Sequence, residues 1–162
     1  MITIEGLSKV YKNKYAALQD IDLVIGTGMF GLLGLNGAGK TTLMRIIATL
    51  LHPTSGEVQV HGFSLTKQPE KIREMIGYFP QQFQIYPQLT AIEFLDYVIV
   101  DEPTAGLDPE ERVRFRNLLA RLSIDRTIIL STHIVGGVFF EEVVYSKKNS
   151  KEIHSKNSRN NN

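Results

Sequence analysis

The sequence predicts an α/β fold with a mainly parallel sheet. Apolar, β-like segments alternate with segments of helical apolar spacing along most of the 162 residues. A glycine-rich stretch at 34–42, Gly-Leu-Asn-Gly-Ala-Gly-Lys-Thr-Thr, stands between an apolar strand and a helix and fits the phosphate-loop pattern GxxxxGK followed by Ser or Thr. With 43% hydrophobic and 22% charged residues, the chain has the composition of one globular domain.

Apolar periodicity and turn residues place the individual elements. Strands are expected at 2–7, 15–25, 29–35, 57–60, 76–79, 97–100 and 126–131. Helices are expected from Lys40 to near Leu51, at 68–75, after Thr90, and at 109–122. His52-Pro53 stops the first helix, and Pro109 suits the first turn of the last one.

The glycine-rich stretch has the composition of a triphosphate site. Its glycines allow the backbone to turn with several N–H groups pointing inward, and the helix that follows adds partial positive charge at the same point. Lys40 can reach the β- and γ-phosphates, and the Thr41 hydroxyl is placed to bind Mg²⁺. The alternative is a turn that merely joins a strand to a helix. The residues expected to contact ATP in this stretch are Gly34, Asn36, Gly37, Gly39, Lys40, Thr41 and Thr42.

A pair of carboxylates follows a second apolar strand. Asp101 and Glu102 come directly after residues 97–100, and ligands of α/β sheets bind at the carboxyl ends of such strands. Asp101 is expected to orient Mg²⁺ through its hydration shell, and Glu102 to polarise the attacking water. Taken alone, Asp-Glu-Pro could be a solvated turn, but the phosphate loop favours the catalytic interpretation.

Composition limits the partners and the cellular compartment that we expect for the chain. The net charge is +1, so charge gives no reason to expect nucleic acid or an anionic membrane as a partner, and we expect no nucleic acid. The chain has no cysteine, which excludes disulfides and thiolate metal sites and fits a reducing cytoplasm. The first residues lack the pattern of a signal peptide, and no apolar run approaches the length of a membrane span.

Four further features give the sequence a family resemblance. An aromatic residue stands at Tyr11, a glutamine ends Ile-Gly-Tyr-Phe-Pro-Gln at Gln81, residues 101–109 read Asp-Glu-Pro-Thr-Ala-Gly-Leu-Asp-Pro, and His133 follows Ser-Thr. With the phosphate loop, these elements over residues 1 to about 135 resemble the ATP-binding cassette family, the ATPase subunits of ABC transporters. Another class of phosphate-loop protein, such as a small-molecule kinase, is disfavoured by His133 and the loop before Pro109.

The resemblance implies roles for these residues. Tyr11 stacks on adenine, the Gln81 amide contacts Mg²⁺ or its water and links the site to a membrane partner, and His133 contacts the γ-phosphate. Catalytic roles thus fall to Glu102, His133 and Gln81, and metal contacts to Thr41, Gln81 and Asp101. The resemblance also implies an antiparallel β portion at the N-terminal end of the fold. Its expected partners are a transmembrane transporter subunit and a second nucleotide-binding subunit reached through the Asp108 loop. Such a subunit lies at the inner face of the membrane.

The sequence departs from the family in the middle of the chain. The family carries a helical subdomain between the glutamine and the acidic strand, with a Leu-Ser-Gly-Gly-Gln signature near its end. Here Glu93 to Val98 resembles the start of that subdomain, yet Ile99 to Glu102 follows at once, and no signature occurs. We infer a seam near 98/99. Because the family completes each ATP site with the signature of the opposite subunit, this chain is expected to provide only half of a paired site.

The chain also departs from the family after Val135. Residues 136–162 diverge and end in a Ser-, Lys- and Asn-rich segment that favours a largely disordered basic tail over a contact with nucleic acid or acidic lipid. The domain assignment is therefore 1–135 for the nucleotide-binding domain and 136–162 for the tail. Two functions stay open: an ABC-type ATPase subunit that couples ATP hydrolysis to transport, or a truncated nucleotide-binding remnant or interaction module with little ATPase activity.

Overall fold

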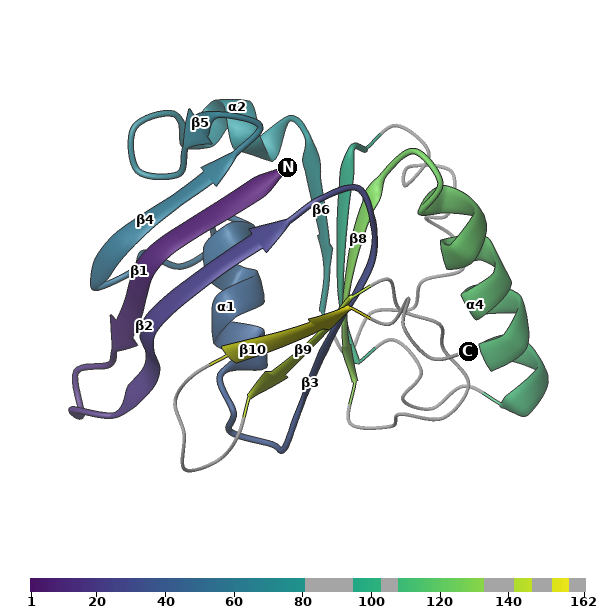
Figure 1. The fold of residues 1–162 in the computed structure, drawn as a ribbon, viewed down its shortest axis with the longest axis horizontal. Coiled ribbons are helices and arrows are strands. Elements are labelled where there is room, and N and C mark those ends of the chain that lie inside the picture. Colours follow the sequence, from purple (N-terminus) through teal and green to yellow (C-terminus); the bar gives the residue numbers. More distant parts are fainter. Residues whose placement is uncertain (81–94, 103–107, 133–141, 147–152, 158–162) are drawn as a thin grey trace.

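The computed structural model describes residues 1–80, 95–102, 108–132, 142–146 and 153–157 (Figure 1). Two sheets and the helices between and beside them make up the described part. The predicted fold class is confirmed, because an antiparallel sheet formed from the N-terminal part of the chain accompanies a mainly parallel sheet.

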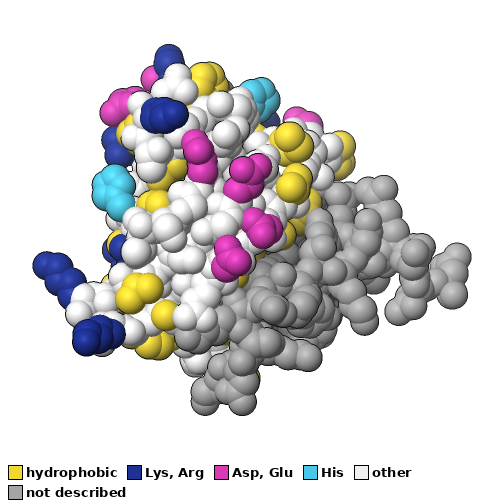
Figure 2. All heavy atoms as spheres, turned by 60° about the vertical axis from the view of Figure 1, so that its left-hand side comes forward, with side chains coloured by type: hydrophobic (Ala, Val, Ile, Leu, Met, Phe, Trp, Pro, Cys, Tyr) yellow, Lys and Arg dark blue, Asp and Glu magenta, His cyan; other side chains and the backbone are white. Residues whose placement is uncertain are grey.

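The antiparallel sheet has the strand order β2-β1-β4-β5. Its strands are β1 (Ile2–Val10), β2 (Ala16–Ile25), β4 (Ser55–Val60) and β5 (Phe63–Ser64). The alternation of apolar and polar residues decides which face of the sheet is buried: Ile2, Ile4 and Leu7 are buried, while Glu5 is exposed. Figure 2 shows acidic side chains on the outward face of this part of the molecule.

The core sheet has the order β10-β9-β3-β8-β7-β6. Its strands are β3 (Gly28–Gly34), β6 (Ile76–Phe79), β7 (Tyr97–Asp101), β8 (Thr127–Thr132), β9 (Glu142–Ser146) and β10 (Ile153–Asn157). All neighbours are parallel except β9 and β10. The carboxyl ends of β3, β8 and β7 therefore lie at one edge of the sheet, where Leu33 pairs with Thr132 and Asp101 pairs with Ser131.

Helices cover both faces of the core sheet. Helix α1 (Lys40–Ile47) lies between the two sheets, and its Leu43, Met44, Ile46 and Ile47 are buried in one apolar cluster with residues of both. Helix α4 (Pro109–Leu122) covers the opposite face through Phe115, Leu119 and Leu122 (Figure 1). A short helix, α2 (Pro69–Arg73), precedes β6. The layers run from the antiparallel sheet through α1 and the core sheet to α4.

The boundaries differ from the sequence expectation in a few places. Helix α1 ends at Ile47 rather than near Leu51, because Thr49 adopts a φ of 61° and the chain closes in a Schellman motif. In that motif the N–H of Leu50 donates to Arg45 O at 2.8 Å and the N–H of Thr49 donates to Ile46 O at 2.9 Å. Strand β5, which has only two residues, was too short to predict.

The C-terminal segment differs from the predicted disordered tail. Residues Glu142–Ser146 form β9, which pairs with β3, and Ile153–Asn157 form β10, which pairs with β9. The physical reason is that β3 offers an unpaired edge on the side away from β8, and a β-prone segment can satisfy its backbone groups there. The structure thus has two strands within 136–162, and the division into a domain at 1–135 and a tail at 136–162 stays a prediction. The other residues of the tail lie outside the described part of the chain.

The inferred seam lies next to a regular strand pair. Ile76 pairs with Tyr97 and Phe79 with Val100, so β7 joins β6 in parallel register directly after the connection at 81–94, which lies outside the described residues. Tyr97 is 3% exposed. Its hydroxyl accepts a hydrogen bond from Met1 N at 2.7 Å, which gives this buried phenol a polar partner. The acidic strand is thus fully integrated into the core sheet.

Candidate functional site

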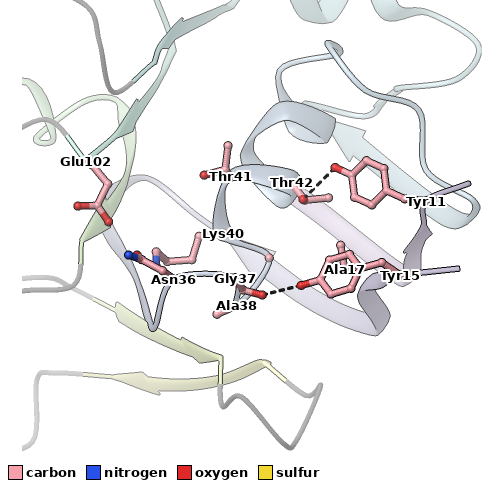
Figure 3. A pocket seen from close by; sticks show the side chains of 11 residues that line it. Tyr11, Tyr15, Ala17, Asn36, Gly37, Ala38, Lys40, Thr41, Thr42 and Glu102 are labelled. Atoms are coloured by element: carbon pink, nitrogen blue, oxygen red, sulfur yellow. Dashed lines mark hydrogen bonds between the residues drawn. The ribbon is translucent and has the colours of Figure 1, made fainter. Parts of the chain in front are cut away.

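A cavity of about 460 Å³ opens beside the start of α1 (Figure 3). Its walls are formed by the phosphate loop, by two tyrosines of the first turn of the antiparallel sheet and by one carboxylate. The lining residues are Tyr11, Tyr15, Ala17, Asn36, Gly37, Ala38, Gly39, Lys40, Thr41, Thr42 and Glu102. These residues come from the turn between β1 and β2, from β2, from the loop between β3 and α1, from α1 and from the residue after β7, so the cavity exists only in the folded chain.

Close packing between the phosphate loop and β2 fixes one wall of this cavity. A Cβ at Gly39 would lie 2.5 Å from Ala17 O and 2.9 Å from Leu18 Cδ2, and the φ of Gly39 is +88°. Only glycine meets both conditions without moving the backbone of β2. The sequence expectation that a glycine is needed here is therefore supported by contact with β2 as well as by the turn.

The phosphate loop presents the ammonium group of Lys40 and the backbone N–H groups at the start of α1. Lys40 Nζ donates to Gly34 O at 2.6 Å and to Leu35 O at 3.3 Å, so its ammonium is held over the loop. Gly39 occupies the N-cap position of α1, which has no side-chain cap. Because backbone N–H groups at a helix start lack partners within the helix, the start of α1 offers donors to an anion in the cavity.

Thr41 connects the loop to the acidic strand. Its Oγ1 donates to Asp101 Oδ2 at 2.8 Å, although the two residues are 60 positions apart in sequence. Asp101 is 5% exposed, and the Ser131 hydroxyl donates to its other oxygen, Oδ1, at 2.5 Å. The carboxylate is thus hydrogen-bonded on both oxygens, and the one that faces Thr41 lies beside the cavity.

Glu102 follows directly and has an unusual backbone. Its φ is 49°, in the left-handed region that costs a non-glycine residue about 1–2 kcal/mol. The N–H of Glu102 donates to Ser131 Oγ at 2.9 Å, which holds the residue in this conformation. This turn brings Glu102 to the cavity wall, while Asp101 stays buried at the end of β7.

Tyr78 contacts the same buried carboxylate from β6. Burial raises the pKa of the Tyr78 phenol, and the negative charge of Asp101 and a hydrogen bond to it raise the pKa further. Arg45 acts in the opposite direction. The phenol therefore remains protonated at neutral pH and can donate to Asp101.

The oxygen atoms at this site suit a cation whose remaining ligands come from a bound nucleotide and water. Among the described residues there is no group of three or more His, Asp or Glu side chains arranged for a metal ion. The Thr41 hydroxyl and the Asp101 carboxylate are hard oxygen donors side by side, and Mg²⁺ in proteins is usually held by one or two such groups together with phosphate oxygens and waters. The site fits Mg²⁺ that arrives with a triphosphate.

The structure brings most of the sequence-predicted site residues together. Tyr11, Asn36, Gly37, Gly39, Lys40, Thr41, Thr42 and Glu102 line the cavity. Asp101 and Gly34 accept hydrogen bonds from Thr41 and Lys40, two of the residues that line the cavity. Two predicted residues, Gln81 and His133, lie outside the described part of the chain. Sequence reasoning missed Tyr15 and Ser131. Tyr15 stands two residues before Ala17 in the segment that leads into β2, and Ser131 is a polar residue near the end of an apolar strand. Each of these features is only a weak indication of a site residue.

In the described part of the chain, no helix is long and apolar enough to cross a membrane.

Comparison with known proteins shows the family of this chain. A sequence model of the ABC transporter family matches residues 18–138. The ABC transporter ATP-binding protein NatA of Bacillus subtilis is 41% identical over 197 residues, which cover 83% of this chain and 80% of that protein. The matched stretch is longer than the 162 residues of this chain, so the relative carries an internal segment that this chain lacks.

Two further comparisons agree. The probable multidrug ABC transporter ATP-binding protein YbhF of Escherichia coli is 42% identical over 98 residues, and the match spans 59% of this chain but only 17% of that protein. A solved dimeric ATP-binding cassette, in a post-hydrolysis state bound to ADP and phosphate, superimposes with a TM-score of 0.86 at 20% identity over 99% of this chain and 100% of that one. This last likeness concerns the fold. The chain belongs to the ABC transporter family as an ATP-binding protein that lacks the segment carrying the family's signature.

Proposed function

We propose that this chain binds ATP with Mg²⁺ as the nucleotide-binding subunit of an ABC transporter, and that it hydrolyses ATP only when a second subunit completes the site. The observation that carries the proposal is the 2.8 Å hydrogen bond from Thr41 Oγ1 to Asp101 Oδ2. It joins a phosphate loop to an acidic strand end, which is the pairing that a bound triphosphate and its cation require.

The charged and hydroxyl groups at the cavity have defined tasks in this proposal. Lys40 exchanges its backbone acceptors for phosphate oxygens, and the N–H groups at the start of α1 hold the same phosphates. Thr41 and Asp101 are the residues that would hold Mg²⁺, which would supply positive charge beside the phosphates. Glu102 accepts a proton from the attacking water, and its carboxylate reaches the cavity because of the turn at its own backbone.

The missing signature limits what one copy can do. Phosphoryl transfer depends on positioned groups that stabilise charge, and removal of a single such donor in other enzymes costs about 10²–10³ in rate. A pair of identical copies lacks the signature on both sides, so we propose a different, signature-bearing nucleotide-binding subunit as the partner. A transmembrane subunit would hold the pair at the inner face of the membrane.

The lack of the signature also favours a second candidate function, a remnant that binds ATP but hydrolyses little. One experiment decides between them. ATP affinity and steady-state hydrolysis are measured for the purified chain, for Lys40→Ala and for Glu102→Gln, with and without an intact nucleotide-binding subunit. We expect Mg²⁺-dependent binding that Lys40→Ala removes, and turnover above that of the intact subunit alone only when the wild-type chain, and not Glu102→Gln, is added. Turnover that stays at the level of Glu102→Gln in every mixture would support the remnant.

A separate outcome would overturn the need for a partner. If the chain alone hydrolyses ATP rapidly and Glu102→Gln abolishes this activity, the signature is dispensable here.

A second experiment tests the cation site. If Thr41→Val binds ATP equally well with Mg²⁺ and with a chelator, while the wild-type chain prefers Mg²⁺, the placement of the cation at Thr41 is supported. Equal Mg²⁺ dependence in both would contradict it.

A further inference from the structure

Two tyrosines, not one, stand at the mouth of the cavity. Tyr11 and Tyr15 flank a tight turn that is closed by the N–H of Tyr11 donating to Tyr15 O at 2.8 Å. Their ring centroids are 6.4 Å apart, and the ring planes are within 22° of parallel. Both line the cavity, and Figure 3 shows the two rings on the same side of it, one beside the start of α1 and the other beside the phosphate loop.

The two hydroxyls are anchored to different parts of the site. Tyr11 Oη lies 3.2 Å from Thr42 Oγ1 in the first turn of α1. Tyr15 Oη donates to Gly37 O at 2.9 Å, on the backbone of the phosphate loop. The peptide after Gly37 has its N–H opposite this carbonyl, so a donor that holds the carbonyl also fixes the direction of the N–H.

The fold gives Tyr15 this position. Residues two apart in an extended segment share a face, and Tyr15 and Ala17 both line the cavity. The same face therefore carries the Tyr15 side chain over Gly37. Tyr15 nevertheless remains 49% exposed, so part of its side chain is accessible to a ligand.

We propose that Tyr15 is a second nucleotide-contact residue, which offers its ring to the base beside Tyr11 and holds the phosphate loop through its hydroxyl. This inference rests on the proposed binding of ATP and names a residue that recognises the nucleoside half of it. Near-parallel aromatic groups suit a flat base, which stacks at centroid separations of about 4.5–7 Å. Because the hydroxyl already fixes the ring, little side-chain freedom is lost on binding.

The two contributions can be separated with two variants and two ligands. Tyr15→Ala removes ring and hydroxyl, and Tyr15→Phe removes the hydroxyl alone. ATP has a base, and inorganic tripolyphosphate has none. We expect Tyr15→Phe to weaken both ligands by a similar factor of about 2 to 10, the range for one hydrogen bond. Tyr15→Ala should weaken ATP by about 5- to 100-fold, the range for base stacking, and tripolyphosphate no more than Tyr15→Phe does.

Controls separate the possible failures. Val24→Ala, at a 55% exposed position of β2, the strand that begins directly after Tyr15, should bind both ligands as the wild-type chain does. If the wild-type chain shows no binding that depends on Lys40, the proposed function is wrong and the role of Tyr15 fails with it. If Lys40-dependent binding is present but Tyr15→Ala weakens ATP no more than tripolyphosphate, only the role of Tyr15 is wrong. Tyr15→Leu, which keeps apolar bulk without an aromatic face, replaces Tyr15→Ala if that variant does not fold.

Discussion

The Ser131 hydroxyl donates to Asp101 Oδ1 at 2.5 Å and accepts a hydrogen bond from the N–H of Glu102 at 2.9 Å. One buried hydroxyl on β8 therefore holds both members of the carboxylate pair at the end of β7. Ser131 is fully buried, at 0% exposure, and pairs with Asp101 in the sheet register. The positions of the Asp101 and Glu102 carboxylates therefore depend on β8, the strand that precedes His133 in the sequence.

We expect Ser131→Ala to lower the free energy of unfolding by about 1–3 kcal/mol, because a buried carboxylate oxygen and a buried N–H lose their partner. Chemical denaturation measures this change. The Mg²⁺ dependence of ATP affinity should also weaken, since Asp101 then loses one of its three partners in the described part of the chain and keeps Thr41 and Tyr78. Ser123→Ala is the matched control, because the Ser123 hydroxyl donates to Ala120 O at an exposed position. Equal stability of the two variants would contradict the structural role.

Local sequence patterns predicted the elements of the core sheet well but missed the links between them. The strand at 76–79 and the helix at 109–122 match β6 and α4 residue for residue, because each has an apolar face and a proline at one boundary. Ser131 meets Asp101, and Tyr15 meets Gly37, only in the folded chain, so no spacing in the sequence revealed either residue. Strand β9 was missed for the same reason, since its partner β3 lies over a hundred residues earlier.

The loop glycines differ in what they tolerate, and this gives a second prediction. Gly37 and Gly39 have φ values of +83° and +88°, so alanine is strained at both. At Gly37 a Cβ would meet nothing within 4 Å, whereas at Gly39 it would lie 2.5 Å from Ala17 O. We expect Gly37→Ala to cost about 1–2 kcal/mol of stability from backbone strain alone. Gly39→Ala should cost more and abolish ATP binding, because the contact is with backbone.

Thermal unfolding and ATP titration of the two variants test this difference. A third variant, Gly26→Ala, is the control, since a Cβ there would also meet nothing within 4 Å and its φ lies outside the left-handed region. It should leave both stability and ATP affinity unchanged. If Gly39→Ala is as stable as Gly37→Ala and binds ATP, then β2 does not pack against the loop as described.

Alkaline pH should destabilise the chain through two buried phenols. Burial raises the pKa of Tyr78 above its ordinary value of 10.0, and Asp101 raises it further. Burial likewise raises the pKa of Tyr97, with a smaller contribution from Asp96. A raised pKa in the folded state means that the unfolded chain loses these protons first as the pH rises. The stabilisation is therefore complete below pH 10.0 and declines as the pH climbs through the folded-state values.

Urea unfolding from about pH 9 to about pH 11, across the ordinary tyrosine pKa, measures this decline. Tyr78→Phe and Tyr97→Phe should each make the dependence on pH shallower, because the phenylalanine ring has no proton to lose. Ultraviolet absorbance of the phenolate gives an independent measure of the same titration. A pH dependence that is as steep in the double variant as in the wild-type chain would show that other groups cause it.

Asp108 has a role in the fold that is separate from any partner. It is the N-cap of α4: its Oδ1 accepts from the N–H of Glu111 at 2.8 Å, and Glu111 Oε2 accepts from the N–H of Asp108 at 3.3 Å. The helix that this capping box starts covers one face of the core sheet through Phe115 and Leu119. We expect Asp108→Ala to lower stability by about 1 kcal/mol, and Asp108→Asn, which keeps a capping oxygen, to lower it by less than about 0.5 kcal/mol.

The same pair of variants tests the proposed contact with a second subunit. If Asp108 acts only by capping, Asp108→Asn restores both the stability and the association with an intact nucleotide-binding subunit that Asp108→Ala loses. If its carboxylate also contacts the partner, Asp108→Asn keeps the stability but loses association, because asparagine caps the helix without carrying the charge. Chemical denaturation and analytical ultracentrifugation of the mixtures measure the two quantities separately. We expect the second result, since the aspartate is exposed and, among the described residues, its cap uses Oδ1 and not Oδ2.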